Sequence, residues 1–146
     1  MKFQAFAMER WQSTYEHTVR FNLSESGVEP LTLGELIELA NLDPGELRDT
    51  LIEYNPSDGS PALRSAIADM YSGATPNNVV VTNGGAEANF VTSWVLCEPG
   101  DDVLYLAPNY MQVPGMAANW GCTARPLHLR EKAGWQPDPE DLSALV

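Results

Sequence analysis

The stretch that decides the fold is VVVTNGGAEA, which runs from Val79 to Ala88. Its first four residues are β-branched, and such a run is typical of a buried strand. The strand is predicted to stop at the pair Gly84 and Gly85, and a helix is predicted from Glu87 to Cys97. Glycines let a ligand approach the backbone, and the first turn of a helix offers free N–H groups at its positive end. A phosphate site fits this stretch, and a tight turn without a ligand fits it equally well.

Strands and helices alternate after this stretch. Further strands are predicted from Val103 to Leu106 and from Thr123 to Leu129, with a short helix between them that ends near Trp120. Another helix is predicted to begin at Asp138. Because right-handed crossovers join parallel strands, the pattern predicts an α/β fold with a mostly parallel sheet flanked by helices.

The first half of the chain is predicted to be helical. A helix is expected from about Ala5 to Tyr15. Thr32 and Glu35 have the spacing of a capping box, and Asp43-Pro44 and Ser60-Pro61 each place a capping residue before a proline at the first helical position. These helices are expected to form a separate layer or arm.

Composition excludes several classes of partner. The chain has 146 residues, with 8 Lys and Arg against 20 Asp and Glu, for a formal charge of −12. Such a balance disfavours nucleic acids and anionic membranes, because both attract clustered cations. No signal peptide or membrane span is predicted, and Cys97 and Cys122 are expected to be free thiols, so the expected compartment is the cytoplasm. His17 and His128 lack ligand-spaced partners, so no metal site is predicted.

The kind of phosphate ligand can be narrowed. A dinucleotide site needs an acidic residue about 20 positions on, at the end of the next strand. Ala107 to Asn109 stand there, while Asp101 and Asp102 lie at the opposite end of that strand. A dinucleotide is therefore disfavoured as the ligand.

Tyr110 follows the strand and is expected to lie near the glycine turn, because neighbouring parallel strands end at the same edge. A ligand with both a phosphate and an aromatic ring fits this pair, and a tyrosine packed against its own helix is the alternative.

Several motifs together resemble class I/II aminotransferases, which are fold-type-I enzymes that use pyridoxal 5′-phosphate (PLP). The resemblance runs from Phe21 to the C-terminus, and the stretch from Asn22 to Val28 resembles the branch that contains capreomycidine-synthase-like enzymes. The motifs, in the order and spacing of the family, are Tyr54-x-Pro56-x-x-Gly59, Leu63-Arg64-x-Ala66-Ile67-Ala68, Thr82-Asn83-Gly84-Gly85-Ala86-Glu87-Ala88, Pro99-Gly100-Asp101 and Pro108-x-Tyr110.

The resemblance implies a role for five residues. Gly85 and Ala86 would donate backbone N–H groups to the PLP phosphate, and Tyr110 would stack on the pyridine ring. Tyr54 would reach the phosphate of the cofactor in the partner subunit, and Gly27 would lie by the substrate carboxylate. The family often has Ser or Thr at the position of Ala86, so one hydroxyl contact to the phosphate is missing here.

The matched region lacks the lysine that forms the Schiff base with PLP in the family. PLP chemistry needs a lysine for the internal Schiff base. The only lysines are Lys2 and Lys132, and neither lies in the family's lysine context. No catalytic residue can therefore be assigned within the chain, and the fragment alone is expected to be inactive.

The sequence is thus interpreted as the N-terminal portion of an aminotransferase-like enzyme, apparently truncated. Residues 1–53 would be a helical arm or part of a small domain, and residues 54–146 a partial PLP-binding large domain. The whole enzyme would act on an amino acid and a 2-oxo acid through an aldimine, as a homodimer. Two alternatives stay open: a truncated, non-catalytic paralogue that serves as a binding or dimerisation module, and a small-molecule-binding α/β domain unrelated to PLP.

Overall fold

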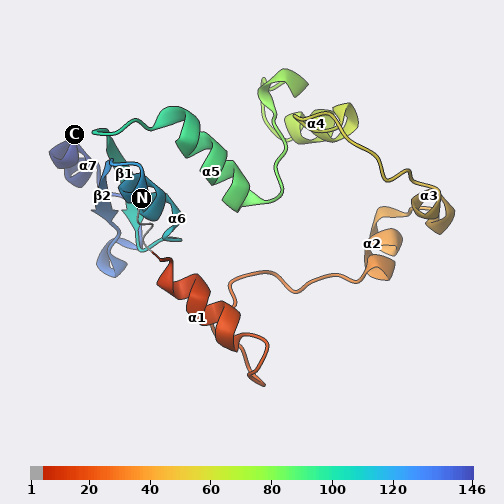
Figure 1. Ribbon diagram of the computed structural model, residues 1–146, viewed down its shortest axis with the longest axis horizontal. Helices are drawn as coiled ribbons and strands as arrows, with labels where there is room; N and C mark the ends of the chain where they lie inside the picture. The colour runs from red at the N-terminus through yellow and green to blue at the C-terminus, as the bar shows by residue number, and fades with distance from the viewer. Residues whose placement is uncertain (1–4) are drawn as a thin grey trace.

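The computed structural model describes residues 5–146 (Figure 1). Lys2 therefore lies outside the described residues. In the first half of the described chain the regular elements are short helices separated by connections, and in the second half strands and helices alternate. In chain order the elements are α1 (Ala7–Tyr15), α2 (Leu33–Ala40), α3 (Pro44–Arg48), α4 (Pro61–Ala68), the 3-10 turn η1 (Pro76–Asn78), α5 (Gly85–Leu96), β1 (Asp102–Ala107), α6 (Gln112–Asn119), β2 (Thr123–His128), the 3-10 turn η2 (Glu131–Ala133) and α7 (Pro139–Leu145).

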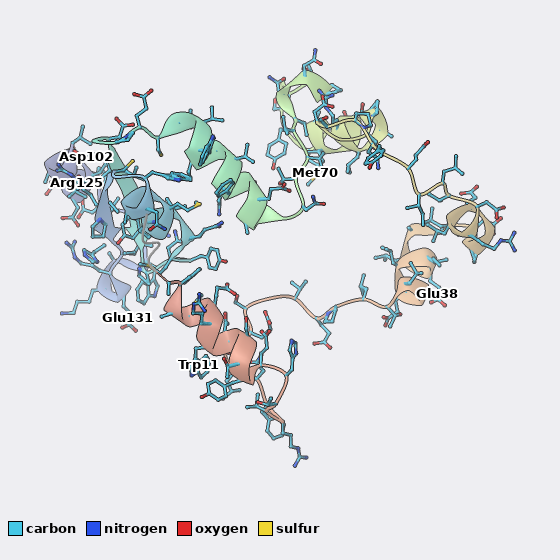
Figure 2. All side chains as sticks on the ribbon, in the orientation of Figure 1. Trp11, Glu38, Met70, Asp102, Arg125 and Glu131 are labelled. Carbon is cyan, nitrogen blue, oxygen red and sulfur yellow. The ribbon has the colours of Figure 1, made fainter. Side chains whose placement is uncertain are left out.

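The second half contains a parallel β–α–β unit. Strands β1 and β2 pair in parallel, with Asp102 opposite Thr123 and Ala107 opposite His128. Helix α6 connects the two strands and packs on both, α5 packs on α6, and α7 packs on β2. Across the ladder, Arg125 and Asp102 form an ion pair with an N–O distance of 2.7 Å, and their side chains meet in Figure 2. The predicted α/β architecture is confirmed for this part of the chain.

Buried residues are few, and most of them belong to this unit. Ala117 on α6 is 2% exposed. Cys122, just before β2, and Leu127, within β2, are also buried. Pro114 on α6 is buried beside them. The core of the described residues therefore lies between α6 and the two strands.

The helix starts follow the capping residues that the sequence indicates. Glu35 N–H donates to Thr32 Oγ1 at 3.2 Å, and Thr32 N–H donates to a Glu35 carboxylate oxygen at 2.7 Å. These bonds from Thr32 hold the pKa of Glu35 below its ordinary value, because they favour the charged carboxylate. Ser60 Oγ accepts from Leu63 N–H at 3.3 Å at the start of α4. Helix α1 was expected from Ala5 and begins at Ala7.

The predicted strand from Val79 to Thr82 has no strand partner among residues 5–146. Val79 has extended backbone angles, with φ −117° and ψ 128°. Val81 N–H donates to Asp58 O at 3.0 Å, but Val80 is 68% exposed. A strand needs a neighbouring ladder to be fixed and covered, and a β-branched run supplies only the tendency to extend. The expectation of a buried strand is therefore wrong for this structure, and the helix after it begins at Gly85 instead of Glu87.

Residues 5–146 form an open arc. Figure 1 shows α1, the α2–α3 pair and α4 spaced along extended connections that leave α1 and return to α5. In Figure 2 side chains on these helices, such as Trp11 and Glu38, project where no other element faces them. The accessible surface is 12170 Å². A compact monomer of 16.0 kDa exposes about 7,400 Å², so much of this surface is of the kind that proteins cover.

A search of residues 5–146 finds no helix of the length and apolarity that crossing a membrane requires.

Candidate functional site

The glycine turn leads from the extended stretch into α5. Gly84 is the N-cap residue, with φ 90° and ψ 167°, a conformation that L-residues with a side chain rarely adopt. Thr82 Oγ1 donates to Gly84 O at 3.0 Å, and Asn83 N–H donates to a carboxylate oxygen of Glu87. The turn is therefore held by its own side chains.

The amides at the start of α5 are open to a ligand. The first bond of the helix runs from Ala88 N–H to Gly84 O at 3.3 Å. Within residues 5–146 the N–H groups of Gly85 and Ala86 have no acceptor, as expected for the first turn of a helix. Apart from the glycine itself, its chain neighbours and the nearby backbone of α5, no atom lies within 4 Å of a Cβ built at Gly84 or Gly85, so no side chain crowds the turn there. The positive end of a 12-residue helix favours an anion at these amides.

Tyr110 lies between β1 and α6, as the sequence indicates, and it contacts the first helix. Its hydroxyl donates to Glu9 Oε1 at 3.0 Å. The rings of Tyr110 and Phe6 are tilted at 58° with centroids 5.1 Å apart. Burial, and then the hydrogen bond to the charged Glu9, raise the pKa of Tyr110, because both disfavour the phenolate. The hydroxyl is therefore a donor at neutral pH.

Gln112 connects the Tyr110 segment to the glycine turn. Its Nε2 donates to Ala86 O at 2.8 Å, and its Oε1 accepts from Asn89 Nδ2 at 3.0 Å. The structure thus brings Gly85, Ala86 and the residues around Tyr110 into one region. Sequence reasoning missed Gln112, Asn89 and Glu9. The sequence contains one weak signal, the position of Gln112 two residues after Tyr110.

The other predicted site residues lie elsewhere. Tyr54 is fully exposed on the connection between α3 and α4. Gly27 lies on the connection between α1 and α2, where its N–H donates to Glu25 Oε1 at 2.6 Å. Neither residue has a recorded contact with Tyr110 or the glycine turn within the described chain. Lys132 is exposed on η2.

An apolar cavity of about 420 Å³ lies beside this region and not on it. It separates the start of α1 from α6, and its lining includes Phe6, Met8, Met111, Gln112 and Met116. None of the residues from Asn83 to Glu87 lines it. The open amides of Gly85 and Ala86 thus lie outside this cavity, on the surface of the turn.

Known proteins identify the family to which these features belong. Residues 24–146 match the family described as aminotransferase class I and II. The chain is 33% identical over 144 residues to capreomycidine synthase of Streptomyces vinaceus, and the aligned region covers 97% of this chain and 37% of that enzyme. It is 32% identical over 99 residues to aspartate/prephenate aminotransferase of Thermus thermophilus, which covers 64% of this chain and 26% of that enzyme.

Solved structures share the fold. A PLP-dependent aminotransferase from Streptococcus suis matches with a TM-score of 0.90 and 31% identity, over 100% of this chain and 40% of that one. The PLP-dependent cyclase OrfR matches with a TM-score of 0.87 and 27% identity, over 100% of this chain and 38% of that one. The chain therefore spans about two fifths of the length of these relatives, which agrees with its interpretation as an N-terminal portion.

These matches settle the family-level predictions. The expected fold is confirmed, and PLP is confirmed as the cofactor of the family, since the matched structures are described as PLP-dependent. The alternative of an α/β domain unrelated to PLP is wrong, because the family match covers most of the chain. Because the family match spans residues 24–146 and the identity to capreomycidine synthase extends over 97% of the chain, the chain belongs to the class I and II aminotransferase family.

Proposed function

We propose that this chain supplies the phosphate-binding turn and the ring-facing tyrosine of a PLP-dependent enzyme of the aminotransferase type. One observation carries the proposal: the open N–H groups of Gly85 and Ala86 begin α5, and Gln112 ties the Tyr110 segment to that same turn at 2.8 Å. The bond joins the chain next to Tyr110 to the turn, while the Tyr110 hydroxyl and ring contact Glu9 and Phe6. This arrangement supports a site in which the turn would hold the phosphate and Tyr110 would face the ring of one phosphorylated pyridine.

The residues at the start of α5, together with Tyr110, fit PLP as the bound cofactor. Two backbone donors and the positive end of α5 would hold the phosphate, and each hydrogen bond to a charged group contributes about 1.5–3 kcal/mol. Ala86 offers no hydroxyl, so in this chain the backbone carries that contact. Tyr110 would orient the ring by stacking. When bound, PLP supplies an electron sink for reactions at the α-carbon of an amino acid.

The remaining proposed assignments rest on the family resemblance and on the exposure of Tyr54. We assign residues 1–53 to the arm or small domain and residues 54–146 to the PLP-binding large domain. Tyr54 is fully exposed, which suits a residue that reaches a cofactor in the partner subunit of a homodimer. Gly27 would lie by the carboxylate of an amino acid or 2-oxo acid substrate. The Schiff-base lysine would come from outside these residues, so these residues alone would not transaminate.

The proposed compartment is the cytoplasm, and the cysteines support it. Cys97 and Cys122 are free thiols. Cys122 donates to Glu98 O at 3.2 Å, and burial raises the pKa of its thiol. Cys97 lies close enough to contribute to this raised pKa, and two neighbouring cysteines that are both free suit a reducing compartment, because oxidising compartments favour disulfides.

Binding of pyridoxamine 5′-phosphate to the full-length gene product tests the proposal. This compound has the phosphate and the ring but no aldehyde, so it does not react with surface lysines. Gly85→Pro removes one amide donor at a helix position that accepts proline, and Tyr110→Ala removes the ring. Each substitution is expected to weaken binding about tenfold, the loss of roughly 1.4 kcal/mol.

Tyr71→Ala is the matched control, because Tyr71 is an exposed tyrosine outside the site. It is expected to bind as the parent protein does. The proposal is wrong if the parent shows no saturable binding, or if both site variants bind as tightly as the control.

A further inference from the structure

Gln112 uses both ends of its side-chain amide. The donor end reaches Ala86 O at 2.8 Å, and the acceptor end receives Asn89 Nδ2 at 3.0 Å. Because Asn89 donates to Oε1, the NH₂ group of Gln112 is directed at the Ala86 carbonyl. Both partners are on α5, 26 and 23 residues before Gln112, so the side chain joins two elements that are distant in the chain.

The two helices are joined at another place by aromatic rings. Phe90 on α5 lies 5.8 Å from Trp120 at the end of α6, and Trp94 lies 5.8 Å from the same indole. This cluster fixes the C-terminal end of α6 against α5. Gln112 fixes the N-terminal end of α6 to the first turn of α5, and Tyr110 lies two residues before it in the chain. The Gln112 contacts therefore join the Tyr110 segment to the phosphate turn, while the Tyr110 side chain itself contacts Glu9 and Phe6.

We propose that Gln112, oriented by Asn89, is a positioning residue that sets the distance between the phosphate turn and Tyr110 so that one cofactor reaches both. The inference rests on the proposed function. Glutamine suits the task because it donates and accepts at once, whereas glutamate lacks the donor and leucine lacks both groups. The turn keeps its own bonds through Thr82 and Glu87, so each anchor can form without Gln112.

Separate probes for the two anchors test this role in the full-length protein. Inorganic phosphate reports the turn alone, pyridoxamine reports the ring site alone, and pyridoxamine 5′-phosphate needs both in register. Gln112→Leu is expected to raise the Kd for pyridoxamine 5′-phosphate at least about fivefold, and to change the Kd for each half-probe by less than about twofold. Gln112→Glu keeps the acceptor for Asn89 but turns a carboxylate toward the Ala86 carbonyl, so it is expected to behave as Gln112→Leu does.

Induced circular dichroism of the bound pyridoxamine 5′-phosphate supplies a second readout. The signal is expected to change in Gln112→Leu at saturating ligand, because the ring orientation changes while the backbone spectrum stays the same. Gln136→Leu is the matched control, since Gln136 is exposed and lies outside the site. It is expected to leave both the Kd and the signal unchanged.

The possible failures are distinguishable. If Gly85→Pro weakens binding but Gln112→Leu does not, the role of Gln112 is wrong and the proposed function stands. If Gln112→Leu weakens all three probes equally, Gln112 supports the fold generally and the positioning role is wrong. If the parent protein does not bind pyridoxamine 5′-phosphate, both proposals are wrong.

Discussion

One hydrogen bond between single residues joins the two halves of the chain. Tyr110 donates to Glu9 at 3.0 Å across 101 residues of sequence, and Phe6 packs against the same ring. Helix α1 is thereby fixed beside the residue that is proposed to face the cofactor. The position of the first helix and the position of the Tyr110 ring are thus linked in this structure.

The titration of Tyr110 tests that contact. We expect its pKa to lie above the ordinary 10.0 and to fall in Glu9→Gln, because the amide still accepts the hydrogen bond but carries no charge. Burial remains, so the pKa should not return fully to the ordinary value. A raised folded-state pKa means that the stabilisation is complete below about pH 10 and is lost as the pH rises through the folded pKa.

Ultraviolet difference titration of the parent protein against Tyr110→Phe isolates this one phenol from the other tyrosines. Glu16→Gln is the control, because Glu16 is also on the first helical segment but contacts His17 instead. An unchanged Tyr110 titration in Glu9→Gln would show that the contact is absent in solution.

The residues of the site differ in how far the sequence revealed them. Gly85 and Tyr110 were proposed as site residues because each comes shortly after a local pattern, a β-branched run or a strand end. Glu9 and Gln112 were not identified, because their partners lie 101 and 26 residues away and no local pattern encodes such a pairing. Tyr54 and Gly27 were assigned from the family resemblance alone. The roles of these two residues and of Gly85 and Tyr110 stay predictions.

At the level of elements, a loop and one arginine hold the extended stretch that leads to the glycine turn. Arg64 on α4 forms an ion pair with Asp58 and donates to Pro76 O at 2.6 Å. Asp58 O in turn accepts from Val81 N–H at 3.0 Å. These contacts fix the stretch on one side in the absence of a paired strand.

Gly59 in this loop has no room for a side chain. Its φ is +104°, and a Cβ atom there would lie 2.5 Å from Val81 Cγ2. Gly59→Ala is therefore expected to lower the free energy of unfolding of this segment by about 1–3 kcal/mol, through backbone strain and the clash together. Hydrogen exchange of the Val81 amide measures the loss directly.

Gly73→Ala separates the two causes. Gly73 also has a positive φ, +78°, but no atom lies within 4 Å of its Cβ position. It carries the strain without the clash, so it should cost less than Gly59→Ala. Equal losses in the two variants would show that contact with Val81 contributes nothing.

The elements themselves were predicted unequally well, for a physical reason. Helices that begin at Ser60, Thr32 and Asp43 were recognised because a cap and its amide are within three residues of each other. The strand from Val79 to Thr82 was predicted and is unpaired, because a strand depends on a neighbour that its own sequence does not specify.

For the whole molecule, exposed apolar surface is the dominant feature. The accessible area of 12170 Å² exceeds the size expectation of about 7,400 Å², and large side chains such as Leu23, Ile52 and Trp94 are mostly exposed. An excess of this size is typical of a surface that further protein covers in the assembled molecule. The formal charge of −12 opposes close approach of like chains, but it does not cover apolar groups.

The 146 residues expressed alone are therefore expected to self-associate and to bind the dye ANS strongly. Sedimentation velocity measures the association, and dye fluorescence measures the exposed apolar surface. Raising the salt concentration should increase association, because it screens the acidic charge and strengthens apolar burial. A compact monomer that does not bind the dye would contradict the open arc seen in Figure 1.

The hydrogen bond between Glu9 and Tyr110 also constrains the order of events during translation. Helix α1 is synthesised well before its partner, because Tyr110 follows Glu9 by 101 residues. Until then, the apolar residues of α1 and of the connection after it have no established place. The local β1–α6–β2 unit has short-range contacts and can fold quickly once it emerges. Helix α1 therefore docks only after the chain has been made as far as Tyr110, and in the interval its apolar residues are free to meet other partners.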